Sequence, residues 1–316
     1  MKQNKINRIL NKIPLHAITI FIMIIWIVPT LGLLITSFRP VSLINTTGWW
    51  TFLSTDQEDT TLFTIENYVD ALVGYRGTRT YLQDCESGDQ PVSLNCDLSD
   101  LLNPRGMGRA FVNSLLVTIP STIIPILFAA FAGYAFAWLD FKGRYFLFAI
   151  LVGLQVVPLQ MTLVPILRVY AKLGMNGTFW GVWLFHTGFG MPYAIYLLRN
   201  YLGSLPKDLF ESAYLDGASH WSAFWKLAIP LSTPAIASLA IFQFLWVWND
   251  LLVALVFLGG TKPVMTYQIS NMVSSLGAGW HILTAAAFLS MLLPMIIFFA
   301  LQRFFVRGML AGAVKG

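Results

Sequence analysis

Long apolar runs without a charged residue constrain the fold of this chain more than any other feature. A helix crosses a bilayer with about 20 apolar residues, and six runs reach that length. Only 11% of the residues are charged, whereas about a quarter are charged in soluble domains. We predict an all-α membrane protein of six transmembrane helices, at Leu15–Phe38, Ala110–Leu139, Tyr145–Leu167, Leu173–Leu198, Thr233–Leu258 (interrupted only by Asp250) and within the uncharged tract between Lys262 and Arg303.

The lysines and arginines predict the orientation of these helices, because short cytoplasmic loops are enriched in them. With the N-terminus inside, that side holds twelve of the 20, and the short outside loops hold only Arg168, Lys172 and Lys262. We expect a cytoplasmic N-terminal tail (1–14), one transmembrane domain (15–306) and a cytoplasmic C-terminal tail (307–316). The net charge of +5 follows from this bias and does not indicate nucleic-acid binding.

The one large polar segment, about 39–109, follows the first helix and falls outside the cytoplasm in this topology. It holds ten of the fifteen acidic residues and both cysteines, Cys85 and Cys96. We predict a small, partly ordered external cap. Disulfides form on the oxidising side of a membrane, so a Cys85–Cys96 disulfide is expected, with two free thiols as the alternative.

Residues Ser204–Leu231 separate the fourth and fifth runs and have the pattern of a helical hairpin. Ser204 is a candidate N-cap, with Pro206 in the first turn. Gly217 stands where a helix ends in a left-handed residue, and Ser219 can cap a second helix. One face of the first helix is predicted to carry Leu209, Ala213 and Gly217 at helical spacing.

This hairpin resembles the EAA loop of the membrane subunits of binding-protein-dependent ABC importers. That pattern is EAA, three residues, G, nine residues, I-x-L-P, and the chain has Glu211-Ser212-Ala213, Gly217 and Leu227–Pro230 at matching positions. An unrelated cytoplasmic hairpin is the alternative. The resemblance implies that the hairpin contacts an ATPase through Glu211, Ser212, Ala213, Asp216, Gly217, Ala218, Ile229 and Pro230.

Other segments are similar to the G-type permeases of the maltose-type, carbohydrate-uptake-1 family, and the opening is similar to its alpha-glucoside and glucosylglycerol branch. They are Phe111–Leu116, Leu139–Arg144, Leu173–Thr178 and Gly308–Gly316, with Leu31–Pro40 and Gly48–Trp50 in the opening. The resemblance implies a permease subunit of a sugar importer in a bacterial inner membrane. Its partners would be an F-type permease, two ATPase subunits and an extracytoplasmic sugar-binding protein. An oligosaccharide or alpha-glucoside is the expected substrate, and another small polar solute, such as a polyol or glycerol phosphate, is the alternative.

Polar residues inside the apolar runs are candidates for the sugar path, namely Gln155, Gln243, Asn249 and Asp250. An acid within a membrane span is functional by default, yet Asn249 and Asp250 could instead bond to backbone or to a neighbouring subunit. By the resemblance, the loop Gly259–Gly279, with Lys262 and Tyr267, would meet the binding protein. A passive loop remains the alternative there.

Motifs for catalysis are missing from the sequence. It contains no G-x-x-x-x-G-K-[ST] for binding ATP and no H-E-x-x-H or G-x-S-x-G, so ATP and Mg²⁺ are expected in the partner ATPase and no cofactor on this chain. Two other classes stay open. One is an ion-coupled secondary transporter or channel, which would need charged residues inside the helix bundle, and Asp250 is the one candidate for such a charge. The other is a membrane enzyme, which would need a polar catalytic cluster.

Overall fold

The computed structural model describes residues 13–53, 63–74, 98–272 and 279–313, and these contain helices and no β-strand. This confirms the predicted all-α class. Cys85 and Cys96 lie outside the described residues, so their disulfide stays a prediction. The chain divides into two compact units, Met1–Met107 with Asn271–Leu289 and Gly108–Ser270 with Ser290–Gly316.

In the first unit, a buried arginine and a buried asparagine fix the end of the first helix. Arg39, only 3% exposed, donates hydrogen bonds to Thr47 and Thr51. The Asn67 amide donates to the carbonyls of Ser37, at 2.9 Å, and Arg39, at 2.8 Å. The described helices of the first unit before α6 are α2 Ile13–Ser37, α3 Val41–Ile44, η1 Trp49–Leu53, α4 Glu66–Val73 and η2 Leu98–Leu102.

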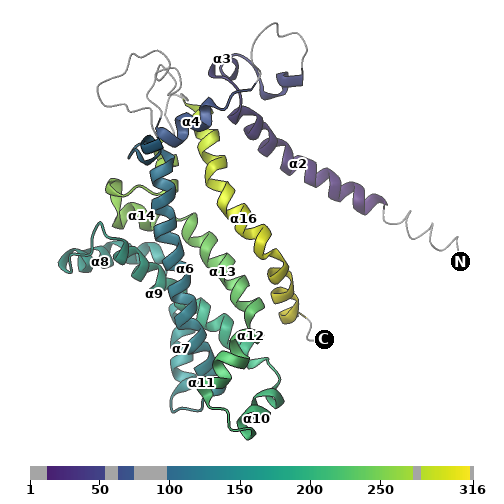
Figure 1. The fold of residues 1–316 in the computed structure, drawn as a ribbon, viewed down its shortest axis with the longest axis vertical. Coiled ribbons are helices and arrows are strands. Elements are labelled where there is room, and N and C mark those ends of the chain that lie inside the picture. Colours follow the sequence, from purple (N-terminus) through teal and green to yellow (C-terminus); the bar gives the residue numbers. More distant parts are fainter. Residues whose placement is uncertain (1–12, 54–62, 75–97, 273–278, 314–316) are drawn as a thin grey trace, which may run out of the picture. The chain divides into compact units, whose positions relative to one another are not determined.

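The second unit is built on the long helix α6, Met107–Trp138, and on α9, Phe179–Gly203. Helices α7 and α13 pack against α9 (Figure 1). Thr178 begins α9 by accepting a hydrogen bond from the Gly181 N–H at 3.3 Å, as N-cap residues do. The other elements are α7 Arg144–Leu154, α8 Leu159–Lys172, α10 Lys207–Leu215, α11 His220–Ala223, the π-helical η3 Phe224–Ala228, α12 Ile229–Leu231, α13 Thr233–Trp248, α14 Leu252–Phe257, η4 Gly259–Thr261 and α15 Met265–Met272, and α16 Trp280–Ala313 belongs to both units.

Three of the described helices are long and apolar enough to cross a membrane: α2, α6 and α16. Two sharply bent pairs, α7 with α8 and the His220–Leu231 segment with α13, raise this number to five if each pair is one crossing. Helix α9 has 25 residues but is not among the helices that are both long enough and apolar enough to cross a membrane. The structure thus supports a membrane protein without confirming six crossings.

The third and fifth predicted helices are wrong as single helices. The run Tyr145–Leu167 breaks into α7 and α8, bent by 99°, because Pro158 has no N–H to donate and disfavours helical backbone at the residue before it. The run Thr233–Leu258 breaks after Trp248, and Asp250 lies in the gap before α14. Helix α6, in contrast, passes unbroken through Pro120 and Pro125.

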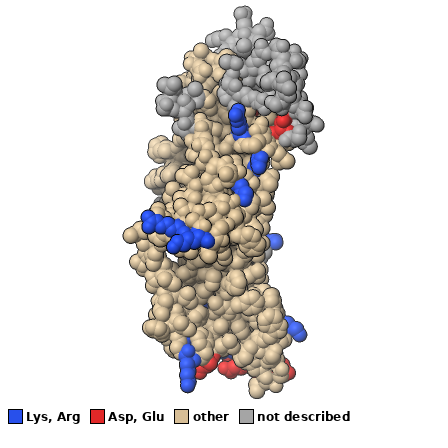
Figure 2. All heavy atoms as spheres, turned by 90° about the vertical axis from the view of Figure 1, so that its left-hand side faces the viewer, with Lys and Arg blue, Asp and Glu red and all other residues tan. Residues whose placement is uncertain are grey.

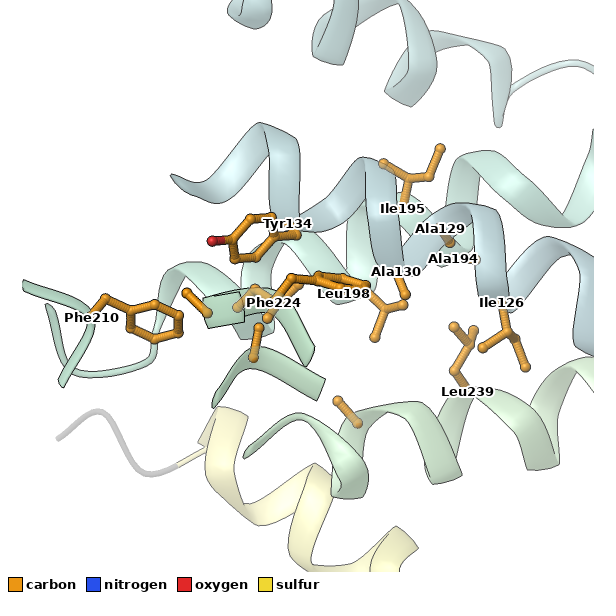
Figure 3. Close-up of a cluster of buried hydrophobic side chains, with 14 residues drawn as sticks. Ile126, Ala129, Ala130, Tyr134, Ala194, Ile195, Leu198, Phe210, Phe224 and Leu239 are labelled. Carbon is orange, nitrogen blue, oxygen red and sulfur yellow. The ribbon is translucent and has the colours of Figure 1, made fainter. Parts of the chain in front are cut away.

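A cluster of buried side chains joins α6, α9 and α13 to the hairpin between α9 and α13 (Figure 3). Small residues bring the helices close: a Cβ on Gly133 would lie only 3.1 Å from the Arg199 backbone nitrogen. Two hairpin residues, Phe210 and Phe224, are buried in the same cluster. The hairpin is therefore part of the core of this unit rather than an appended loop.

Candidate functional site

The turn of the hairpin is a Schellman motif centred on Gly217. The N–H of Ala218 donates to the carbonyl of Ala213 at 2.9 Å, and the N–H of Gly217 donates to the carbonyl of Tyr214 at 3.0 Å, which is the bonding pattern of that motif. Gly217 has φ +84°, and a Cβ there would meet nothing within 4 Å. Glycine is therefore required by the backbone conformation and not by lack of space, as the sequence predicts.

The second arm begins as predicted and the first arm does not. Ser219 accepts a hydrogen bond from the Ser222 N–H at 3.2 Å and so caps α11. Ser204 caps nothing at the start of α10, because α9 continues through Gly203 and the Ser204 hydroxyl donates to the Tyr201 carbonyl at 2.7 Å. Pro206 occupies the N-cap position of α10 instead.

The π-helical η3 follows α11, and its widened turn is closed by the Ile229 N–H, which donates to the Phe224 carbonyl. Such segments often occur at functional sites. Pro230 lies in the short α12, after which the chain bends by 70° into α13. Residues Leu227–Pro230, which match the end of the family pattern, therefore lie in one continuous helical segment.

The buried face of α10 is centred on Phe210, one residue away from the predicted stripe. Phe210 has no exposed surface, and its ring stacks on Trp138 of α6 at 3.8 Å between centroids. Leu209 is 47% exposed and Ala213 is half-buried. Glu211 is exposed, so it is available to a partner.

Three polar side chains fix the turn to α6. The hydroxyls of Tyr134 and Tyr214 lie 3.1 Å apart, and Tyr134 also donates to the His220 carbonyl at 3.2 Å. The Nδ1 atom of His220 lies 3.1 Å from the Tyr214 hydroxyl. These contacts cross from α6 to both arms of the hairpin, so the hairpin and the end of α6 are expected to move as one body.

The outward surface of the hairpin combines acidic and large apolar side chains. Asp208, Glu211 and Asp216 are exposed, and Leu215 and Trp221 are 89% and 64% exposed. Figure 2 shows acidic side chains gathered at the lower end of the molecule, where Figure 1 places α10. Exposed apolar residues rimmed by polar ones mark protein-interaction sites.

A cavity of about 350 Å³ lies between α9 and α13 and contains one of the predicted path residues, Gln243. The Gln243 amide is 5% exposed and donates from Nε2 to the Ser121 carbonyl at 3.1 Å. Gly190 leaves room for it, because a Cβ there would lie 2.6 Å from Nε2. The lining residues are Phe189, Gly190, Tyr193, Leu239, Phe242, Gln243 and Trp246.

The other predicted path residues lie elsewhere. Asn249 donates to the Leu245 carbonyl at 2.8 Å. One carboxylate oxygen of Asp250 accepts from the N–H groups of Val253 and Ala254, at 2.9 and 3.2 Å, and so caps α14. Both contacts fit the alternative that these two residues bond to backbone. Gln155 is exposed at the break between α7 and α8.

The loop before the last helix, 259–279, is held in its described part by contacts that sequence reasoning missed. Asn113 of α6 donates to the Pro263 carbonyl at 2.9 Å, and Ser114 accepts from the Met265 N–H at 2.8 Å. The sequence feature that could have indicated these contacts is the polar pair Asn113-Ser114 near the start of an apolar run. The Lys262 ammonium donates to the Gly177 carbonyl at 2.6 Å, and Tyr267 is half-buried.

Residues 110–311 match the family described as the inner membrane component of binding-protein-dependent transport systems. The chain is 53% identical, over 96% of its length and 93% of the relative's, to the osmoprotective compounds uptake permease protein GgtD of Synechocystis. It is 41% identical, over 95% and 96%, to the alpha-glucoside transport system permease protein AglG of Rhizobium meliloti.

The fold is similar to that of a chain in the crystal structure of a bacterial ABC transporter that imports the acidic polysaccharide alginate. The TM-score is 0.65 at 17% identity, over 96% of this chain and 98% of the other. A second structure of an alginate transporter, in complex with a periplasmic protein that carries an alginate pentasaccharide, gives a TM-score of 0.53. These likenesses concern the fold.

Proposed function

Because the chain belongs to the inner membrane components of binding-protein-dependent transport systems, we propose that it forms half of the translocation pathway of an ATP-driven sugar importer. The other half would be an F-type permease. Six crossings, with both termini cytoplasmic and 15–306 as the transmembrane domain, complete the proposal. In this topology the hairpin lies on the cytoplasmic side and the segment 39–109 outside.

The attachment of the hairpin to α6 is the observation that supports ATP coupling. A helix of 32 residues is about 48 Å long, more than the thickness of a bilayer core. Its last turns hold the hairpin through Tyr134 and Trp138, and its first turns hold the outer loop through Asn113 and Ser114. A displacement of the hairpin by a partner would thus be transmitted along α6.

Two ATPase subunits are the proposed cytoplasmic partners, one of which receives the hairpin. Glu211 and the exposed Leu215 offer it a charge and an apolar anchor. ATP and Mg²⁺ would be held by those subunits, since this sequence has no phosphate-binding loop. The rigid turn at Gly217 would keep the two arms at a fixed angle while the partner moves.

An extracytoplasmic sugar-binding protein is the proposed partner on the other side, at the loop 259–279. Lys262 and Tyr267 belong to this loop, of which residues 273–278 lie outside the described part of the chain. The bond from Lys262 to Gly177 and its position 4.8 Å from the Phe179 ring centre suit a lysine that positions the loop. Contact with the binding protein would then involve the described part of the loop, which this bond holds in place.

The substrate proposal is an alpha-glucoside or a short oligosaccharide, supported by the relative named for alpha-glucoside transport. The relative named for osmoprotective compounds favours a second candidate, a small polyhydroxylated osmolyte. An ion-coupled mechanism has less support, because the carboxylate of Asp250 is used to cap α14.

Uptake by cells that lack only this chain tests the proposal. We expect ATP-dependent uptake of radiolabelled maltose or sucrose to be lost and to return when the chain is restored. Loss of glucosylglycerol uptake alone would select the second candidate. Unchanged uptake of every saccharide and polyol tested, or uptake that persists without ATP, would contradict the proposal.

A further inference from the structure

A small cavity lies inside the second unit, next to the break between α13 and α14. Its volume is about 10 Å³, which is close to the space that one water molecule needs. The polar part of its lining comes from Ser114 and Thr118 of α6, His186 of α9 and Asp250 in the break. Polar side chains from three separate segments of the chain therefore face one enclosed space.

His186 is the side chain of this cavity that most needs a hydrogen-bond partner. It is only 1% exposed, and neither Nδ1 nor Nε2 forms a hydrogen bond within the part of the chain that the structure describes. Its Nε2 atom lies 4.0 Å from the Oδ2 atom of Asp250, which is too far for a hydrogen bond. Because buried polar groups are nearly always bonded to protein or to ordered water, a partner for Nε2 is expected in the cavity.

The other polar groups suit a water molecule as that partner. The Asp250 carboxylate has about four acceptor sites, and the N–H groups of Val253 and Ala254 use two of them. Thr118 is 1% exposed, and its hydroxyl bonds to no residue in the described ranges. Water both donates and accepts, so it serves His186 Nε2 in either tautomer of a neutral imidazole.

A direct bond and a metal ion fit this cavity less well. Both side chains are already held in place, Asp250 by its cap on α14 and His186 by an edge-to-face contact with Trp246 at 5.1 Å between ring centres. A direct bond would require one of them to move by about 1 Å. No group of three His, Cys, Asp or Glu side chains that could hold a metal ion occurs among the described residues.

We infer that one water molecule binds in this cavity and joins three segments of the second unit. It donates to the Asp250 carboxylate, accepts from the Thr118 hydroxyl and forms a third bond with His186 Nε2. The Asp250 carbonyl also accepts from the Thr266 hydroxyl at 2.7 Å, so the break carries part of the loop 259–279. The water therefore fixes α6 and α9 relative to the base of that loop, whichever solute is transported.

A double-mutant cycle on thermal unfolding tests whether the two side chains share a ligand. The sample is the full-length chain, purified in detergent with the subunits that co-purify with it. Thr118→Val removes one bond to the water at nearly constant volume, and we expect it to lower the melting temperature by about 2–4 °C. In a His186→Leu background the water is lost, so Thr118→Val should then change the melting temperature by less than about 1 °C.

Two further variants sharpen the cycle. His186→Gln has an amide that can bond to the water, so in this background Thr118→Val should again lower the melting temperature. Thr122→Val is the matched control, since Thr122 lies one turn along α6 and its buried hydroxyl also has no partner among the described residues, but it does not line the cavity. We expect Thr122→Val to have the same effect with and without His186→Leu.

Three results would overturn the inference. Equal effects of Thr118→Val in the wild-type and His186→Leu backgrounds would show that the two side chains share no ligand. A wild-type melting temperature that falls when sodium chloride is replaced by choline chloride, with no such fall in Thr118→Val, would show a sodium ion in place of the water. A structure at a resolution that reveals waters, with an empty cavity or with His186 bonded directly to Asp250, would exclude the water itself.

Discussion

Replacement of Gly217 tests whether the hairpin transmits force. An alanine in the left-handed conformation costs roughly 1–2 kcal/mol. Opening the turn instead gives up the two hydrogen bonds donated by Gly217 and Ala218, worth about 1 kcal/mol each. The two alternatives are of similar energy, so Gly217→Ala is expected to populate both, with about half of the hairpins misshapen.

Asparagine and aspartate refine this test. Asn tolerates the left-handed region, so Gly217→Asn should retain most uptake, while uptake by Gly217→Ala should fall about twofold. Gly217→Asp has a similar backbone preference but adds a carboxylate beside Asp216 on the surface proposed to meet the ATPase. We expect it to abolish uptake by uncoupling, with ATP hydrolysis and membrane insertion retained.

The assay compares ATP hydrolysis with sugar uptake in proteoliposomes that contain the whole importer, and insertion is measured as the amount of chain in the membrane fraction. Gly203→Ala is the control, because this glycine has no left-handed φ and its Cβ would meet nothing within 4 Å. Normal ATP-dependent uptake by Gly217→Asp would refute the assignment of this hairpin as the coupling element.

Three further predictions concern packing and capping. Phe210→Ala should loosen the hairpin by about 3–5 kcal/mol and lower uptake per ATP hydrolysed, whereas Leu209→Ala should leave both near wild type; equal effects would contradict the packing described for α10. Asp250→Ala should lower stability by about 1 kcal/mol through loss of the α14 cap and Asp250→Asn should not, as thermal unfolding in detergent would show; loss of transport in Asp250→Asn would instead indicate a role for the charge. Lys262→Met should lower the melting temperature, and a selective loss of stimulation by the binding protein at an unchanged melting temperature would show direct contact.

The hairpin turn was predictable from the sequence because its determinants are local. A single glycine followed by a capping serine specifies the turn between two arms, and both Gly217 and Ser219 have the predicted roles. Ser204 was mispredicted because α9 runs on through Gly203, so Ser204 follows the end of α9 and Pro206 takes the N-cap position of α10.

Helix continuity and side-chain pairing were less predictable, because they depend on tertiary contacts. Pro120, Pro125 and Pro158 look alike in sequence, yet only the last coincides with a break. Likewise, Phe210 and Leu209 are both plausible core residues, and Trp138 on a distant helix decides which one is buried. The cavity that holds Gln243 requires α9 and α13 to be adjacent, which no local pattern reveals.

Purification of the tagged chain from its native membranes in mild detergent, followed by an ATPase assay, tests the proposed importer most directly. We predict that an ATPase and a second permease co-purify, and that a sugar-loaded binding protein stimulates ATP hydrolysis by the complex. A chain that elutes alone in every detergent, or an ATPase indifferent to sugar and binding protein, would contradict the proposal.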